Sequence, residues 1–85
     1  MCYTYVLLCE NGSYYKGYTQ DLERRFELHL NGSGAKHTAK HKPLKIAYYE
    51  TFKTEQEAIE REKHLKSGSG REWLKTQLEL KEDTA

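Results

Sequence analysis

Hydrophobic and β-branched residues are concentrated in three short stretches with the composition of β-strands. These stretches are residues 3–9 (YTYVLLC), residues 14–19 and residues 44–52. Residues 10–13 separate the first two with an Asn-Gly pair, which is typical of a hairpin turn. A helical pattern separates the second stretch from the third. We therefore expect a hairpin, followed by a third strand that does not continue it.

The hairpin turn leaves two registers open, and they differ in what they place on each face of the sheet. A two-residue loop would put Tyr5 and Tyr15 on opposite faces. A three-residue loop with Gly12 left-handed in a bulge shifts the pairing by one residue and puts Tyr5, Tyr15 and Gly17 on one face. A site that uses both tyrosines requires the second register.

Residues 21–30 have the periodicity of an amphipathic helix, which starts after Thr19 or Asp21, both favourable N-cap residues. At about 100° per residue, the apolar stripe of this helix consists of Leu22, Phe26 and Leu30. The segment that follows, residues 31–43, is rich in Gly and Lys and reads as a loop.

Arg25 and His29 are four residues apart and lie along one edge of that stripe, whereas Arg24 points away from it. Arg25 is therefore the better candidate for a site against the sheet. A salt bridge from Arg25 to Asp21 is the structural alternative. For His29, a half-buried structural histidine is an equally good interpretation.

A second helix begins at Thr54, which forms a capping box with Glu57 three residues later. Its apolar stripe consists of Ala58, Glu62 and Leu65, with Ile59 at the edge. Glu62 thus lies on the side that faces the core, and Glu60 lies on the opposite side. A carboxylate on an apolar stripe needs a partner, which is either a metal ion or a buried Lys or Arg.

Ser67-Gly68 ends this helix, and Ser69 with Glu72 predicts another capping box that starts a third helix. The apolar residues of the third helix that can pack are Trp73, Leu74 and Leu78. Residues 81–85 read as a frayed tail, so that one domain spans residues 1–80.

Charge is balanced over the whole chain but not along it. The 85 residues carry a net charge of +1, yet no Asp or Glu occurs between Glu27 and Glu50. The basic residues of that window are Lys36, Lys40, Lys42 and Lys45 with His29, His37 and His41. A segment with positive charges only is more typical of a phosphate-binding surface than of a loop that is simply exposed to solvent.

Cys2 and Cys9 are the two cysteines. Two thiols without a signal peptide indicate a reducing, cytoplasmic setting, and no apolar run has membrane-spanning length. The two cysteines together with His37 and His41 suggest zinc superficially. The cysteine spacing is wider than that of the usual ligand pairs, which disfavours zinc.

In its order of motifs, the chain resembles the GIY-YIG nuclease superfamily, and most closely its small single-domain bacterial members, the UPF0213-like proteins. The resemblance covers residues 3–75. Tyr3 stands where the first motif has Gly, and Lys16 stands where the second has an apolar residue. The matching segments and residues are Tyr3-Thr4-Tyr5, Tyr15-Lys16-Gly17, Arg25, His29, Gly34-Ala35-Lys36-His37-Thr38 with Pro43, and Glu62.

The resemblance implies an α/β (α+β) fold in the order strand, strand, helix, strand, helix, helix, with a small, largely antiparallel three-stranded sheet. It also implies a metal-dependent endonuclease of low sequence specificity that hydrolyses phosphodiester bonds, with DNA favoured over RNA. The implied catalytic residues are Tyr5, Tyr15, Arg25, His29 and Glu62. The expected nucleic-acid contacts are Lys16, Lys36, Thr38, Lys40 and Lys42.

Glu62 would hold a single divalent cation, Mg²⁺ or Mn²⁺, weakly in the absence of substrate. Tyr5 or Tyr15 would take the proton of the attacking water as a tyrosinate or with help from His29, and Arg25 would bind phosphate oxygens. Two other functions remain open. One is a non-catalytic nucleic-acid-binding module, and the other is an interaction subunit of a larger repair or restriction assembly.

Overall fold

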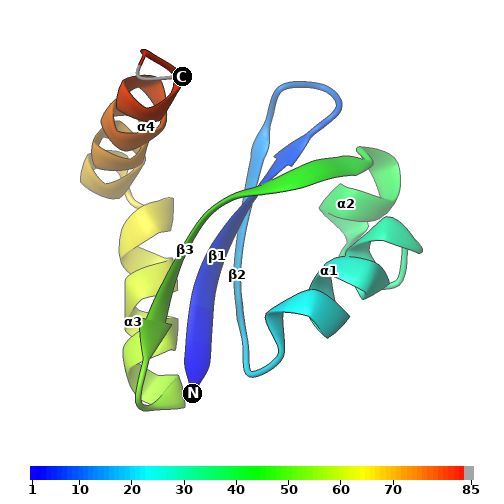
Figure 1. Ribbon diagram of the computed structural model, residues 1–85, viewed down its shortest axis with the longest axis horizontal. Helices are drawn as coiled ribbons and strands as arrows, with labels where there is room; N and C mark the ends of the chain where they lie inside the picture. Colours follow the sequence, from blue (N-terminus) through cyan, green and yellow to red (C-terminus); the bar gives the residue numbers. More distant parts are fainter. Residues whose placement is uncertain (84–85) are drawn as a thin grey trace.

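A three-stranded antiparallel sheet lies between two pairs of helices (Figure 1). The computed structural model describes the backbone of residues 1–83 and the side chains of residues 1–78. The elements along the chain are β1 (Cys2–Cys9), β2 (Tyr14–Thr19), α1 (Leu22–Leu30), α2 (Lys36–Lys40), β3 (Pro43–Phe52), α3 (Glu55–Lys66) and α4 (Gly68–Asp83). The order of the strands in the sheet is β2-β1-β3. The expected α+β fold is confirmed.

The hairpin adopts the three-residue register. Tyr5 pairs with Gly17 across β1 and β2, and Gly12 has a φ of 85°, in the left-handed region that suits glycine. The N–H of Gly12 donates to the carbonyl of Cys9 at 2.9 Å, and the N–H of Cys9 donates to the carbonyl of Ser13 at 2.9 Å. Tyr5 and Tyr15 therefore lie on one face of the sheet.

The opposite face carries the aliphatic core. Its central cluster consists of Val6, Leu65, Leu74 and Leu78. The hydroxyl of Thr4 donates to the carbonyl of Ala58 at 2.7 Å and fixes α3 against β1. Ala58 and Leu65 are fully buried, and Glu60 is exposed, as the helical pattern predicted. Helices α3 and α4 thus cover one face, and α1 and α2 cover the other (Figure 1).

Arg61 joins α3 to its neighbours. Its guanidinium group donates three hydrogen bonds to the carboxylate of Glu50 on β3, at 2.9 to 3.1 Å. The same group lies over the ring of Trp73 on α4, 4.6 Å from the ring centroid. The Tyr48 hydroxyl also donates to Glu50, at 2.6 Å. These contacts hold both helices to one edge of the sheet.

The expectations for residues 31–43 and for Leu30 were wrong in part. The expected loop contains the short helix α2, which is held in place by tertiary hydrogen bonds between His37 and Ser13 and between Thr38 and His29. Leu30 is 40% exposed and does not belong to a buried stripe, since α1 buries the ring of His29 there instead.

The capping box expected at Ser69 is also wrong. Helix α4 begins at Gly68, and the hydroxyl of Ser67 accepts a hydrogen bond from the N–H of Gly70 at 3.2 Å. A Cβ atom at Gly70 would collide with the carbonyl of His64, so the tight α3–α4 corner requires a glycine there. Of the tail expected to fray, residues 81–83 are helical, and residues 84–85 lie outside the described residues. No helix in the described part of the chain is long and apolar enough to cross a membrane.

Candidate active site

A cavity of about 610 Å³ opens at the β2 edge of the sheet. Four of the five residues predicted to be catalytic line this cavity, and they come from four different elements. Tyr5 lies on β1, Tyr15 on β2, Arg25 on α1 and Glu62 on α3. The fold therefore brings together side chains that are far apart in the sequence.

Gly17 allows the cavity to form at this point of β2. A Cβ atom at Gly17 would lie 2.5 Å from the hydroxyl oxygen of Tyr5 and 2.6 Å from its Cζ. Any larger residue would push the Tyr5 ring aside, because Tyr5 is only 2% exposed and its ring cannot move freely. Gly17, the glycine of the second motif, thus leaves the space that the ring of Tyr5, the tyrosine of the first motif, occupies.

Tyr5 begins a chain of buried hydrogen bonds. Its hydroxyl lies 2.8 Å from Nε2 of His29, and Nδ1 of His29 lies 2.7 Å from Oγ1 of Thr38. The Thr38 hydroxyl donates to the carbonyl of Ala35, so it accepts from His29 Nδ1–H. Nε2 is then the unprotonated nitrogen, and it accepts the hydroxyl proton of Tyr5.

The burial of these groups sets their protonation. Burial and, less strongly, the neighbouring Tyr15 raise the pKa of Tyr5 well above its usual value, although Arg25 opposes this. Burial and the positive charge of Arg25 lower the pKa of His29. His29 is therefore neutral near pH 7, in the tautomer that the hydrogen bonds require. Tyr5 is likewise protonated near pH 7, and its hydroxyl proton lies in the hydrogen bond to His29.

Tyr15 lies between two histidines. Its ring centroid is 5.1 Å from that of His29 and 5.9 Å from that of His37, with which it is stacked. Nε2 of His37 forms a hydrogen bond of 2.8 Å with Oγ of Ser13 in the hairpin. The prediction did not include His37 among the site residues, because α2 was not foreseen.

Arg25 is half-buried at the wall of the cavity, and its neighbour Arg24 is exposed. The alternative role for Arg25, a salt bridge to Asp21, is not found among the ion pairs of the described residues. Asp21 caps α1 instead, with its carboxylate accepting the N–H of Arg24 at 3.1 Å. The guanidinium group of Arg25 is thus available to an anion in the cavity.

Glu62 has a protein partner. Its Oε1 accepts a hydrogen bond of 2.6 Å from Nζ of Lys66, with the side chain of Glu62 15% exposed and that of Lys66 50% exposed. No group of three His, Cys, Asp or Glu side chains within the described residues is placed to hold a metal ion. A single carboxylate at an open cavity suits Mg²⁺ or Mn²⁺, because Mg²⁺ keeps most of its water ligands.

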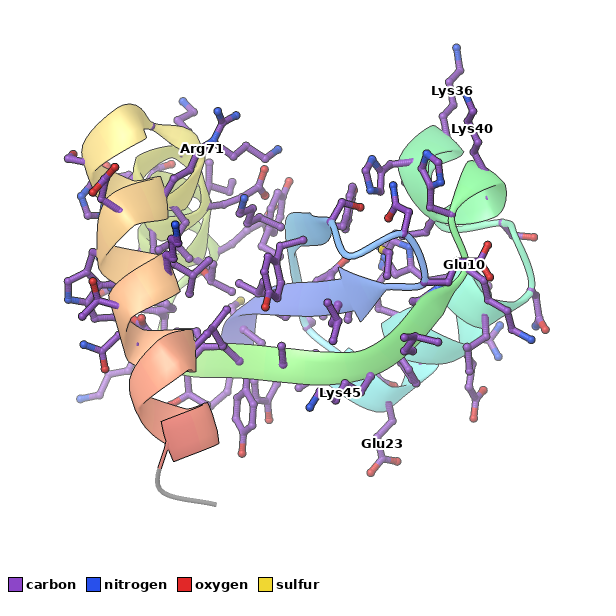
Figure 2. All side chains as sticks on the ribbon, turned by 90° about the horizontal axis from the view of Figure 1, so that it is seen from above. Glu10, Glu23, Lys36, Lys40, Lys45 and Arg71 are labelled. Atoms are coloured by element: carbon purple, nitrogen blue, oxygen red, sulfur yellow. The ribbon has the colours of Figure 1, made fainter. Side chains whose placement is uncertain are left out.

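Of the residues expected to contact nucleic acid, Thr38 was wrongly assigned. It is 2% exposed, and its hydroxyl is used by His29 and Ala35, so it positions the imidazole. Lys36, Lys40 and Lys42 are exposed. Figure 2 shows Lys36 and Lys40 projecting together from α2.

The cavity includes residues that were not predicted to line it. Glu55 lies seven residues before Glu62 and shares its side of α3, a spacing that was visible in the sequence. The part of the lining formed by the turn between β2 and α1 was not predicted, because it depends on the backbone path of that turn. The additional lining residues are Cys2, Tyr18, Thr19, Gln20, Asp21 and Glu55.

Comparison with known proteins gives a consistent result. The family model of the GIY-YIG catalytic domain matches residues 1–76. A UPF0213 protein of Staphylococcus saprophyticus is 42% identical over 73 residues, which cover 86% of this chain and 89% of that protein. A UPF0213 protein of Clostridium perfringens is 44% identical over 66 residues, 78% of this chain and 71% of that protein.

A solved structure also resembles the fold. It is the solution NMR structure of a UPF0213 protein from Bacillus halodurans, with a TM-score of 0.55 and 36% sequence identity. The match covers 91% of this chain and 85% of that chain. The similarity therefore extends over most of both chains.

Proposed function

The chain belongs to the GIY-YIG catalytic domain family, a family of nucleases, and we propose that it is itself a metal-dependent endonuclease that hydrolyses phosphodiester bonds in DNA. The observation that carries this proposal is the meeting of Tyr5, Tyr15, Arg25 and Glu62 in one cavity. Low sequence specificity is expected, because the basic side chains available on this small domain are suited to phosphates rather than to base edges. The buried free thiols of Cys2 and Cys9 fit a cytoplasmic location.

Arg25 would bind the scissile phosphate. Its guanidinium group lines the cavity beside Tyr5 and presents a planar fork that matches phosphate oxygens. A bound phosphate would also offset the positive charge that lowers the pKa of His29. Substrate binding would thereby make His29 a better proton acceptor at the moment when one is needed.

The proton of the attacking water would leave through Tyr5 and His29. The Tyr5 oxygen takes this proton as its own hydroxyl proton passes to Nε2 of His29, 2.8 Å away. The imidazolium that forms keeps its Nδ1–H bond to Thr38. Tyr5 then never needs to exist as a free tyrosinate, which its raised pKa disfavours.

Glu62 is the residue that would hold the divalent ion. The ion would supply charge stabilisation for the leaving 3′ oxygen. Lys66 already neutralises the carboxylate at Oε1, so a cation at Glu62 would either bind Oε2 beside a positive charge or displace Lys66. We therefore expect weak metal binding without substrate.

The experiment that tests this function is cleavage of labelled single-stranded, duplex, flap and branched DNA, and of RNA, with Mg²⁺, with Mn²⁺ and with EDTA. Glu62→Gln and Arg25→Ala should each reduce metal-dependent cleavage by about 100-fold or more. Their matched controls are Glu60→Gln and Arg24→Ala, which change exposed neighbours on the same two helices. These controls should cleave like the wild type.

The ion pair of Glu62 with Lys66 favours one alternative, a non-catalytic nucleic-acid-binding module. In that case Glu62 would be a structural residue. Salt-sensitive DNA binding without cleavage under any metal condition would support this alternative and contradict the nuclease. Binding that Glu62→Gln spares, together with cleavage that it abolishes, would exclude the alternative.

A further inference from the structure

Three basic residues gather where α3 turns into α4 beside β2. Lys16 lies on β2 between Tyr15 and Gly17, and its strand partner is Val6, so its side chain is on the face that α3 and α4 cover. Lys66 is the last residue of α3, and Arg71 lies in the first turn of α4. We call these residues, Lys16, Lys66 and Arg71, the corner cluster.

The charges of the corner cluster act on one another. Burial lowers the pKa of Lys16, and the positive charges of Arg71 and Lys66 lower it further. Lys66 is paired with Glu62, whereas neither Lys16 nor Arg71 takes part in an ion pair within the described part of the chain. Lys16 and Arg71 are thus like charges without an ion-pair partner in that part of the chain, and an anionic ligand would offset their charge.

The corner cluster and the lysines of α2 flank the same edge strand. Helix α2 lies on one side of the sheet, and the α3–α4 corner lies on the other (Figure 1). Figure 2 shows Lys36, Lys40 and Arg71 on one side of the molecule, with Lys45 on the opposite side. Lys66 joins the corner cluster to the cavity through Glu62.

We propose that Lys16, Lys66 and Arg71 form a second phosphate-binding site, which holds the nucleic-acid backbone on the α3–α4 side of β2 while Lys36 and Lys40 hold it on the α2 side. This proposal rests on the proposed function for its ligand class, a nucleic acid. It adds a contact surface that the basic loop of residues 31–43 does not contain. The substrate would thus be held on both sides of Tyr15 and Gly17.

The test is equilibrium binding of a labelled DNA duplex in EDTA, measured at several salt concentrations for the wild type, Lys16→Met and Arg71→Gln. Lys16 is half-buried, and Lys16→Met removes its charge while keeping an apolar side chain of similar length. Each variant should weaken binding and reduce the slope of log K against log salt by about 0.9 for the lost contact. Lys45→Gln is the matched control. Lys45 belongs to the basic window between Glu27 and Glu50, but it lies on the side of the molecule opposite Lys36, Lys40 and Arg71, so this variant should keep the wild-type slope.

Thermal melting of the free proteins separates this role from a structural one. Because Arg71 repels Lys16 in the free protein, Arg71→Gln should leave the melting temperature unchanged or raise it while binding weakens. A lowered melting temperature with unchanged binding would overturn the proposal. Slopes equal to that of Lys45→Gln, or no binding of the wild type at low salt, would overturn it as well. Cleavage plays no part in this readout, so a failure here is distinguishable from a failure of the nuclease proposal.

Discussion

The two faces of β1 show two ways of filling a protein interior. On one face, Val6 is fully buried against Leu65, Leu74 and Leu78 of the two C-terminal helices. On the other face, the adjacent residue Tyr5 is 2% exposed and is hydrogen-bonded to His29. Both faces are buried. The first is mainly aliphatic, with the Thr4 hydroxyl donating to Ala58, whereas the second buries a chain of polar groups that each need a particular partner.

This difference separates stability from chemistry along a single strand. Aliphatic packing is non-directional and tolerates small shifts, whereas a buried hydrogen-bond chain fixes the position of each proton. Gly34 illustrates the close fit on the polar face, because a Cβ atom there would collide with the imidazole of His29. The aliphatic face therefore stabilises the domain, and the polar face orients the candidate catalytic groups.

The largest expected effect lies on the aliphatic face. Leu65→Ala should lower the free energy of unfolding by about 2–5 kcal/mol, because it removes buried methyl groups and leaves a cavity. Urea denaturation measures the loss. Cleavage per folded molecule should stay at the wild-type rate. A large loss of activity in protein that circular dichroism shows to be folded would contradict the separation of the two faces.

Tyr5→Phe should have the opposite profile. It removes only the hydroxyl that donates to His29 Nε2, so the rate of cleavage should fall by about 100-fold or more. The free energy of unfolding should fall by about 1–3 kcal/mol, because Nε2 of His29 loses its hydrogen-bond partner. Tyr49→Phe is the matched control, since Tyr49 is the cross-strand partner of Tyr5 on β3 and is 54% exposed. Equal cleavage by the two variants would remove Tyr5 from the proton path.

The smallest expected effect is the pH dependence of stability that His29 causes. Its pKa in the folded protein is lowered from the ordinary 6.5, so the unfolded chain binds a proton more readily. The contribution of neutral His29 is therefore complete above about pH 6.5 and declines as the pH falls towards the folded-state pKa. His29→Gln should show a flatter decline between pH 7 and pH 5 in urea denaturation. An equal decline in the free energy of unfolding of both proteins would contradict the interpretation that His29 causes this pH dependence.

The sequence by itself determined the three strands, helices α1, α3 and α4, and four of the residues that line the cavity. Strand composition placed the hairpin, and helical periodicity placed Glu62 on the buried side of α3 and Glu60 on the exposed side. These signals are local, since they depend on residues within a few positions of one another. Helical periodicity also separated Arg25 from Arg24 on α1, and the family resemblance agreed with that choice.

Tertiary structure decided the remaining features. The sequence left two hairpin registers open, and the left-handed Gly12 bulge selects the one that puts Tyr5 and Tyr15 together. Helix α2 is too short to be read from periodicity, and its bonds to Ser13 and His29 come from distant parts of the chain.

The same distance in sequence explains the errors and omissions at the site. Thr38 reads as a surface residue of a basic loop, and only the position of His29 shows that it is buried. Lys66 and Arg71 come to the side of the sheet that carries Lys16 because α3 and α4 turn sharply at Gly70. Local patterns specify which face a residue occupies, whereas the partner across that face is specified by packing between segments that the sequence separates.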